Sequence, residues 1–297
     1  MPYIKISDKD IYYEIHGDNN INTLVYFHGG PGASCLDFFG QAKALGEKLK
    51  VVIFDQYGVL RSEGIGDGEA YGMDIQAAMI EEMRQKLGID KWSVLGHSYG
   101  GMLACLYAHK YPSAVDKLIL DCPSLDFIDS SRSIANYMGG YISEYGDDEA
   151  KALLQKLKTA EYTDKTVFSD LTSLLENIED MQLRSYLHGI TFEEYAEKVY
   201  TEKIPDEMWM KSEAHLTKLI EDGKIIENFL PMLKDIPKPL MLIKGRYDPA
   251  CSEEQVRYIK ENIKNARLVM FENSGHFPRI EEAEKYTRCV EDFLTDR

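Results

Sequence analysis

The chain has few cysteines and no long apolar run. Its five cysteines are odd in number, widely scattered and without a C-x-x-C spacing, which argues against a disulfide framework or a zinc site. No stretch of about 18 apolar residues is present that could span a bilayer. The first residues also lack a basic segment followed by an apolar one, as a secretory signal would have. We therefore expect reduced thiols and a cytoplasmic protein.

Basic residues are also scarce relative to acidic ones. Lys and Arg total 34 against 50 for Asp and Glu, which gives a net charge of −16. An acidic surface repels phosphate backbones and anionic membranes, so neither nucleic acid nor a membrane is expected as a partner. The expected partner is a small molecule or a short peptide, and the sequence leaves the oligomeric state open.

Short apolar runs bounded by Gly, Pro and Asp recur along the 297 residues and are typical of strands covered on both faces. Helix-length segments separate the later ones, which predicts βαβ units and a mostly parallel sheet. The predicted strands are Tyr3–Ile6, Ile11–Ile15, Leu24–Phe27, Val51–Phe54, Trp92–Leu95, Leu118–Leu120, Leu240–Ile243 and Arg267–Phe271.

Helical spacing without a convincing strand fills residues 125–234. Within this segment, Thr191-Phe192-Glu193-Glu194 reads as a capping box that begins a helix. The sequence therefore predicts an α/β core made of residues 1–124 and 235–297, interrupted by an inserted helical cap at 125–234.

Gly96-His97-Ser98-Tyr99-Gly100 follows one predicted strand and precedes a helix-like stretch. A G-x-S-x-G sequence in this context is a nucleophile elbow, in which a tight turn exposes the serine above the sheet edge. Small residues must flank that turn, and the nearby helix N-terminus stabilises negative charge. Ser98 is the candidate nucleophile.

Serine needs a base within hydrogen-bonding reach, oriented in turn by a third group. In this fold class the acid and then the histidine follow late strands. Asp248 follows the strand Leu240–Ile243, and His276 follows the strand that ends at Phe271. We predict that His276 takes the Ser98 proton and that Asp248 orients the imidazole. The mechanism requires no metal and no organic cofactor.

Other residues compete for these two roles. Asp121 ends an earlier predicted strand and is the rival acid. Three histidines are rival bases, but His97 is expected to point away from Ser98 and His109 to lie too far along the following helix. The rival bases are His28, His97 and His109.

His28-Gly29-Gly30-Pro31-Gly32 follows the strand Leu24–Phe27. An acyl-transfer site needs backbone N–H groups directed at the oxyanion, and glycines allow the backbone to approach closely. The predicted oxyanion-hole donors are the N–H groups of Gly30 and Tyr99.

Together these pieces resemble the proline iminopeptidase family of α/β-hydrolases, over somewhat under two-thirds of the chain. The most family-specific segments are His28-Gly29-Gly30-Pro31-Gly32 and Asp55-Gln56-Tyr57-Gly58. The resemblance implies an α/β-hydrolase fold with a helical cap between the sixth and seventh strands. It also implies removal of an N-terminal residue, often proline, with cap carboxylates binding the free α-amine.

Two departures from the family bear on specificity. Leu60 stands where the family has a second glycine after D-Q-x-G, so we expect that loop to be remodelled. The Trp-rich, glutamate-bearing cap segment of typical members has no clear counterpart, and the candidate amine binders are Glu193, Glu194 and Glu207. Glu194 serves equally well as a capping residue.

Three functions fit these residues. The first is a serine aminopeptidase. The second is a carboxylesterase, lactonase or related small-molecule hydrolase that uses the same triad. The third is a non-catalytic ligand receptor on the same fold, which would have no need of a complete Ser98, Asp248 and His276 set.

Overall fold

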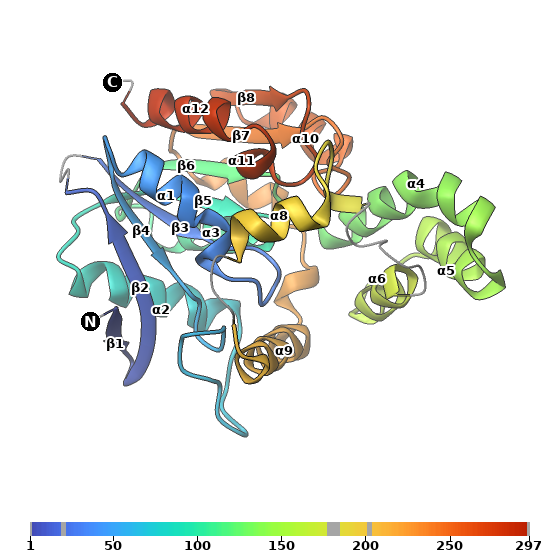
Figure 1. Cartoon of the computed structure of the whole chain (residues 1–297), viewed down its shortest axis with the longest axis horizontal. Helices are drawn as coiled ribbons and strands as arrows, with labels where there is room; N and C mark the ends of the chain where they lie inside the picture. The colour runs from blue at the N-terminus through green and yellow to red at the C-terminus, as the bar shows by residue number, and fades with distance from the viewer. Residues whose placement is uncertain (1, 19–21, 177–184, 201–203, 296–297) are drawn as a thin grey trace.

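A computed structural model describes residues 2–18, 22–176, 185–200 and 204–295. Eight strands form one sheet in the order β1-β2-β4-β3-β5-β6-β7-β8 (Figure 1). The strands β1 and β2 pair antiparallel at one edge, β2 also pairs antiparallel with β4, and all later neighbours are parallel. Their bounds are β1 Tyr3–Ile6, β2 Lys9–His16, β3 Thr23–Phe27, β4 Lys50–Phe54, β5 Trp92–His97, β6 Val115–Asp121, β7 Leu240–Gly245 and β8 Ala266–Phe271.

The central strands are apolar on both faces because helices cover both faces of the sheet. In β3, Leu24 and Tyr26 pack into one core cluster and Val25 and Phe27 into the other. One face is covered by α1 (Phe39–Leu45) and α12 (Ala283–Thr295). The opposite face is covered by α2 (Met73–Lys86), α3 (Tyr99–Lys110) and α10 (Glu253–Asn262).

The chain between β6 and β7 is helical apart from a single isolated bridge between Asp126 and Asn228 in the described part. In Figure 1, α4, α5 and α6 form a group beside the sheet, whereas α8 and α9 lie separately from them. The bounds are α4 Phe127–Tyr145, α5 Asp148–Thr159, α6 Thr166–Glu176, α8 Phe192–Val199 and α9 Asp206–Asp222. No helix among the described residues has the length and apolarity needed to cross a membrane.

These elements confirm the predicted fold class: a mostly parallel sheet with a helical insertion after the sixth strand. The predicted capping box is present at α8, where the Glu194 N–H donates to Thr191 Oγ1 and the Thr191 N–H donates to the Glu194 carboxylate. The boundaries 1–124, 125–234 and 235–297 stay predictions.

The loop at Leu60 corrects one expectation. Leu60 keeps a positive φ of 36° instead of remodelling the turn, although it is not glycine. Its side chain is fully buried in a small apolar cluster that includes Val59, Val199 and Ile280. Burial of a large apolar side chain therefore offsets the strain of the left-handed backbone.

Candidate active site

Ser98 occupies the turn between β5 and α3 with φ 54° and ψ −121°, a conformation that L-residues rarely adopt. The positions of Gly96 and Gly100 have no room for a side chain. A Cβ on Gly96 would lie 2.2 Å from the Gly100 carbonyl oxygen, and a Cβ on Gly100 would lie 2.1 Å from the Phe27 carbonyl oxygen. The turn therefore has the strained strand-to-helix geometry of a nucleophile elbow.

Asp248 and His276 are brought together by the loops that follow β7 and β8. His276 Nδ1 lies 2.9 Å from Asp248 Oδ1, and both side chains are buried. The Asp248 carboxylate also accepts hydrogen bonds from the backbone N–H groups of Ala250 at 2.9 Å and Cys251 at 3.3 Å. Burial alone would raise the pKa of Asp248, but the interactions with His276, the charge of Lys244 and the Ala250 N–H together hold that pKa below its ordinary value. Asp248 is therefore suited to fix the imidazole while remaining ionised.

Ser98 and His276 line the same cavity of about 180 Å³, which we call the aromatic cavity. The contacts of the described residues include no hydrogen bond between Ser98 Oγ and His276. In ligand-free sites the contact between nucleophile and base is often long, and it tightens when substrate binds. The structure therefore brings the three predicted triad residues to one place, with the acid–base pair already formed.

The rival bases have other environments. His28 is buried with its Nε2 accepting from the Gln56 N–H at 3.0 Å, and His109 is exposed near the end of α3. His97 does not simply point away: it lines the aromatic cavity, its ring centre is 4.6 Å from that of His276, and its Nδ1 lies 3.1 Å from the Asp121 carbonyl oxygen. Burial holds the pKa of His97 well below its ordinary value, which keeps the ring neutral.

The rival acid, Asp121, belongs to a buried cluster of hydrogen-bonded polar and charged side chains. Its Oδ2 accepts from the Arg279 guanidinium at 3.2 Å and from the Tyr286 hydroxyl at 3.0 Å. Burial raises the pKa of Asp121, so this carboxyl is less suited than Asp248 to stabilise an imidazolium.

The two residues that carry the predicted oxyanion donors, Gly30 and Tyr99, lie near Ser98. Gly30 has φ 111°, and a Cβ there would lie 2.6 Å from the nitrogens of Gly32 and Ala33, so only glycine fits. Tyr99 is the first residue of α3, and a first-turn N–H has no acceptor within its own helix. Both residues line a second cavity together with Ser98.

Aromatic side chains dominate the aromatic cavity. They come from the insertion and from the His276 loop: Tyr186, Tyr195, Tyr200, Trp209 and Phe277. Asp37 is the one carboxylate among the described lining residues and is 8% exposed. Burial, followed by the charge of Asp37, raises the pKa of Tyr200. Asp37 accepts hydrogen bonds from Tyr26 and Arg279, and Arg279 also contacts Asp121.

The second cavity, which we call the apolar cavity, has a volume of about 50 Å³. No charged side chain occurs among its described lining residues, and α4 and α6 contribute Phe127, Ile134 and Leu171 to it. Gly30, Ser98 and Tyr186 line both cavities. Both cavities therefore reach Ser98.

The predicted amine binders are not brought to this place. Glu193, Glu194 and Glu207 are exposed, and none of them lines either cavity. The Glu194 carboxylate is used in the capping box of α8 instead.

Sequence reasoning missed Asp37 and Tyr186. Asp37 lies on a short 3₁₀ helix, Cys35–Phe38, directly after the glycine-rich loop, and no spacing rule marks it. The Tyr186 carbonyl accepts from the His276 N–H at 2.7 Å, and its ring centre lies 5.0 Å from that of His276. The only sequence signal for Asp37 is its position shortly after the glycine-rich loop.

The described residues contain one group that could hold a metal ion. Cys122, Asp248 and His276 offer ligand atoms within 4.8 Å of one another. Two of these three residues are the hydrogen-bonded acid–base pair, so a metal bound there would compete with that pair.

Comparisons with known proteins identify the family that shares this architecture. Residues 22–283 match the family model described as the alpha/beta hydrolase fold. A proline iminopeptidase of Saccharolobus solfataricus is 30% identical over 296 residues, which span 98% of this chain and 91% of that protein. A solved proline iminopeptidase-related protein of Thermus thermophilus has a TM-score of 0.75 at 19% identity and is matched over 98% of this chain and 95% of its own. An esterase of Exiguobacterium antarcticum has a TM-score of 0.65 at 23% identity, covering 99% of both chains. The chain belongs to the α/β-hydrolase family, among its proline iminopeptidase-like members.

Proposed function

We propose that this hydrolase uses Ser98, His276 and Asp248 to release the N-terminal residue of a short peptide or amide. The observation that carries the proposal is the buried His276–Asp248 pair, at 2.9 Å, in the wall of the cavity that also contains Ser98 at its strained turn. This is the nucleophile–base–acid relationship that acyl transfer requires.

In the proposed reaction, Ser98 Oγ forms a bond to the substrate carbonyl carbon while its proton passes to His276. The oxyanion accepts hydrogen bonds from the N–H groups of Gly30 and Tyr99. The C–N bond then breaks, and the leaving amine takes the proton from His276. Water attacks the acyl-enzyme by the same route and returns Ser98 to its starting state.

The aminopeptidase assignment rests on the relatives and on the chemistry of the aromatic cavity. The relative from Saccharolobus solfataricus, similar along almost the whole chain, is named a proline iminopeptidase. The aromatic rings of the cavity suit a protonated amine, because ring faces attract a cation, and Asp37, which is also ion-paired with Arg279, offers a carboxylate as acceptor. Asp37 therefore replaces Glu193, Glu194 and Glu207 as the proposed amine-binding residue.

A second candidate is an esterase or lactonase with the same triad. The specific observation in its favour is that the predicted cap glutamates are exposed and that the apolar cavity has no charged group among its described lining residues. An uncharged acyl group would fit such a cavity without a counter-ion.

The test compares three substrates: a proline arylamide, the same arylamide with its nitrogen blocked, and a short acyl nitrophenyl ester. Ser98→Ala is the blank for each. Turnover restricted to the free-amine arylamide supports an aminopeptidase. Ester turnover without arylamide turnover would replace it by the esterase, and full turnover in Ser98→Ala would remove Ser98 from the mechanism.

Labelling by a fluorophosphonate probe tests the remaining alternative. A labelled wild-type chain with an unlabelled Ser98→Ala variant supports an activated serine. An unlabelled wild-type chain would favour the non-catalytic ligand receptor.

A further inference from the structure

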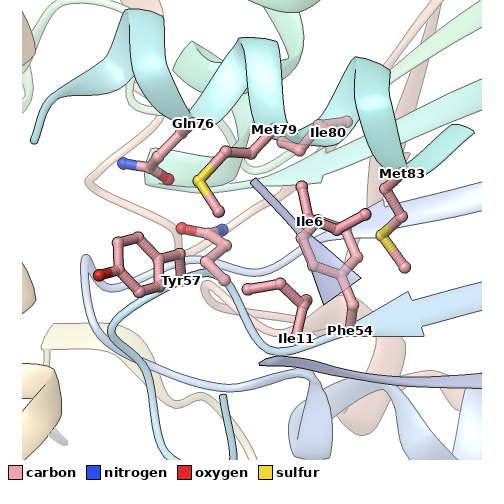
Figure 2. Close-up of a pocket in the computed structure, with 9 residues that line it drawn as sticks. Ile6, Ile11, Phe54, Tyr57, Gln76, Met79, Ile80 and Met83 are labelled. Carbon is pink, nitrogen blue, oxygen red and sulfur yellow. The ribbon is translucent and has the colours of Figure 1, made fainter. Parts of the chain in front are cut away.

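A small cavity lies between α2 and the first strands of the sheet, away from the two cavities at Ser98. Its volume is about 20 Å³. Figure 2 shows Gln76, Met79, Ile80 and Met83 directed into it from one face of α2. The rest of the lining is Ile6, Ile11, Phe54, Gln56 and Tyr57. The cavity is thus mostly apolar, with two carboxamides in its wall.

Both carboxamides have an unpaired oxygen. Gln56 is 1% exposed and Gln76 is 2% exposed, and the Oε1 atom of each has no hydrogen-bond partner among the described residues. Leaving a buried acceptor unpaired costs about 1–3 kcal/mol. Both residues line the same cavity, and a hydrogen-bond donor inside it would satisfy both acceptors.

The nitrogen atoms of the same two side chains hold the segments that carry the proposed oxyanion donors. Gln56 Nε2 donates to the His28 carbonyl at 3.0 Å, and His28 lies two residues before Gly30. Gln76 Nε2 donates to the Tyr99 hydroxyl at 2.8 Å, and the Tyr99 backbone N–H is the other proposed donor. One glutamine thus holds each half of the oxyanion hole.

We propose that a single water molecule in this cavity donates hydrogen bonds to Gln56 Oε1 and Gln76 Oε1, and that this bridge positions the two oxyanion donors relative to each other. A buried water needs a cavity of at least about 10–15 Å³ and two or more polar partners, and this cavity offers both. An ammonium ion does not fit, because no charged side chain is among the described lining residues to compensate a buried cation.

The bridge makes Gln56 and Gln76 positioning residues, because they do not touch the reacting atoms. Oxyanion donors act only when they lie at the correct distance from the developing charge, and the loss of one whole donor costs about a hundredfold or more in rate. Loosening the donors without removing them has a smaller effect. This inference rests on the proposed serine chemistry.

The first test is the rate of Ser98 labelling by a fluorophosphonate, whose phosphoryl oxygen occupies the oxyanion hole. We expect Gln76→Met to lower this rate about tenfold, whereas Gln85→Met, an exposed glutamine on the same helix, leaves it unchanged. Equal rates in wild type and Gln76→Met would overturn the proposal and leave the serine mechanism intact. An unlabelled wild type would contradict the mechanism itself.

Tyr99→Phe is a second variant that opens no cavity and keeps the backbone N–H. It removes the hydroxyl that Gln76 holds, so its effect on the labelling rate and that of Gln76→Met should not add in the double variant. Additive effects would overturn the coupling between these side chains.

The water itself is tested by a high-resolution crystal structure of the wild-type chain. We expect one ordered water within hydrogen-bonding distance of both glutamine oxygens. Glutamine oxygens paired with protein groups, or an empty cavity, would overturn the bridge.

Discussion

The backbone N–H of His188 donates a hydrogen bond to the carboxylate of Glu281, 93 positions further along the chain. The same carboxylate accepts from the N–H groups of Gly275 and Phe277, which flank His276. Glu281 therefore joins the helical insertion to the loop that presents the proposed base. Burial raises the pKa of Glu281 from 4.5 to about 7, against the opposing effect of these N–H groups.

Glu281 predicts a definite pH dependence of stability. Because its pKa is raised in the folded chain, the folded state binds a proton more tightly than the unfolded state. The resulting stabilisation is complete below pH 4.5 and is lost as the pH rises to about 7. The loss amounts to at most about 3 kcal/mol. Urea unfolding at several pH values measures it.

Glu281→Gln is the matched variant, because it keeps the shape and removes the titration. Its free energy of unfolding should change less than that of the wild type between pH 4.5 and 7. Parallel pH profiles of the two proteins would show that another group is responsible.

The choice of Asp248 over Asp121 as the acid gives a second prediction. Asp248→Asn should lower kcat by about 10⁴-fold, because an amide cannot stabilise the imidazolium or select the productive tautomer. Asp121→Asn should have a much smaller effect on kcat, since its carboxylate contacts Arg279 and Tyr286. Steady-state measurement of kcat for the two variants, under conditions in which both are equally folded, decides which carboxylate is the acid. A larger loss in Asp121→Asn would reverse the assignment.

Asp37 gives a third prediction, concerning substrate charge. Asp37→Asn should raise KM for a free-amine substrate by about tenfold or more, the loss expected for one charge-assisted hydrogen bond. Turnover of an amine-free ester should change little. Glu207→Gln is the matched control, because Glu207 is exposed and lines neither cavity. A KM increase in the Glu207 variant alone would return amine binding to the insertion.

Leu60 gives a fourth prediction, in which two effects oppose each other. Leu60→Gly relieves a left-handed backbone at φ 36°, worth about 1–2 kcal/mol. It also removes a fully buried leucine side chain, which costs about 3 kcal/mol or more. We expect a net loss of about 2 kcal/mol in the free energy of unfolding, measured in urea. A stabilised variant would show that backbone strain outweighs burial at this position.

The fold could be predicted, and the residues of the proposed triad could be located, because their signals are local. The buried strands appear as short apolar runs, and Asp248 and His276 each follow such a run, so parallel strands bring them to one edge of the sheet. The elbow is similarly explicit, since Gly96 and Gly100 have no room for a side chain.

The lining of the aromatic cavity could not be predicted in the same way. Its lining comes from separate elements, such as Asp37 on a 3₁₀ helix and Trp209 on α9, and only tertiary packing brings them together. The sequence does not show whether a glutamate on a helix faces the cavity or the solvent. Glu193 and Glu207 therefore could not be told apart from residues that line the cavity. Leu60 shows the same limit. A glycine pattern describes a backbone conformation, and it does not reveal that burial of a leucine side chain can stabilise the same conformation.

Only Gly30, Ser98 and Tyr186 are shared by the two cavities among the described residues. The remaining walls come from different parts of the chain, with α8 and α9 on one side and α4 and α6 on the other. Under the proposed function, mutations in one wall should therefore alter preference for one half of a substrate while leaving the other half and the bond-breaking step unchanged. An enzyme built in this way can diversify, or be redesigned, one substrate half at a time.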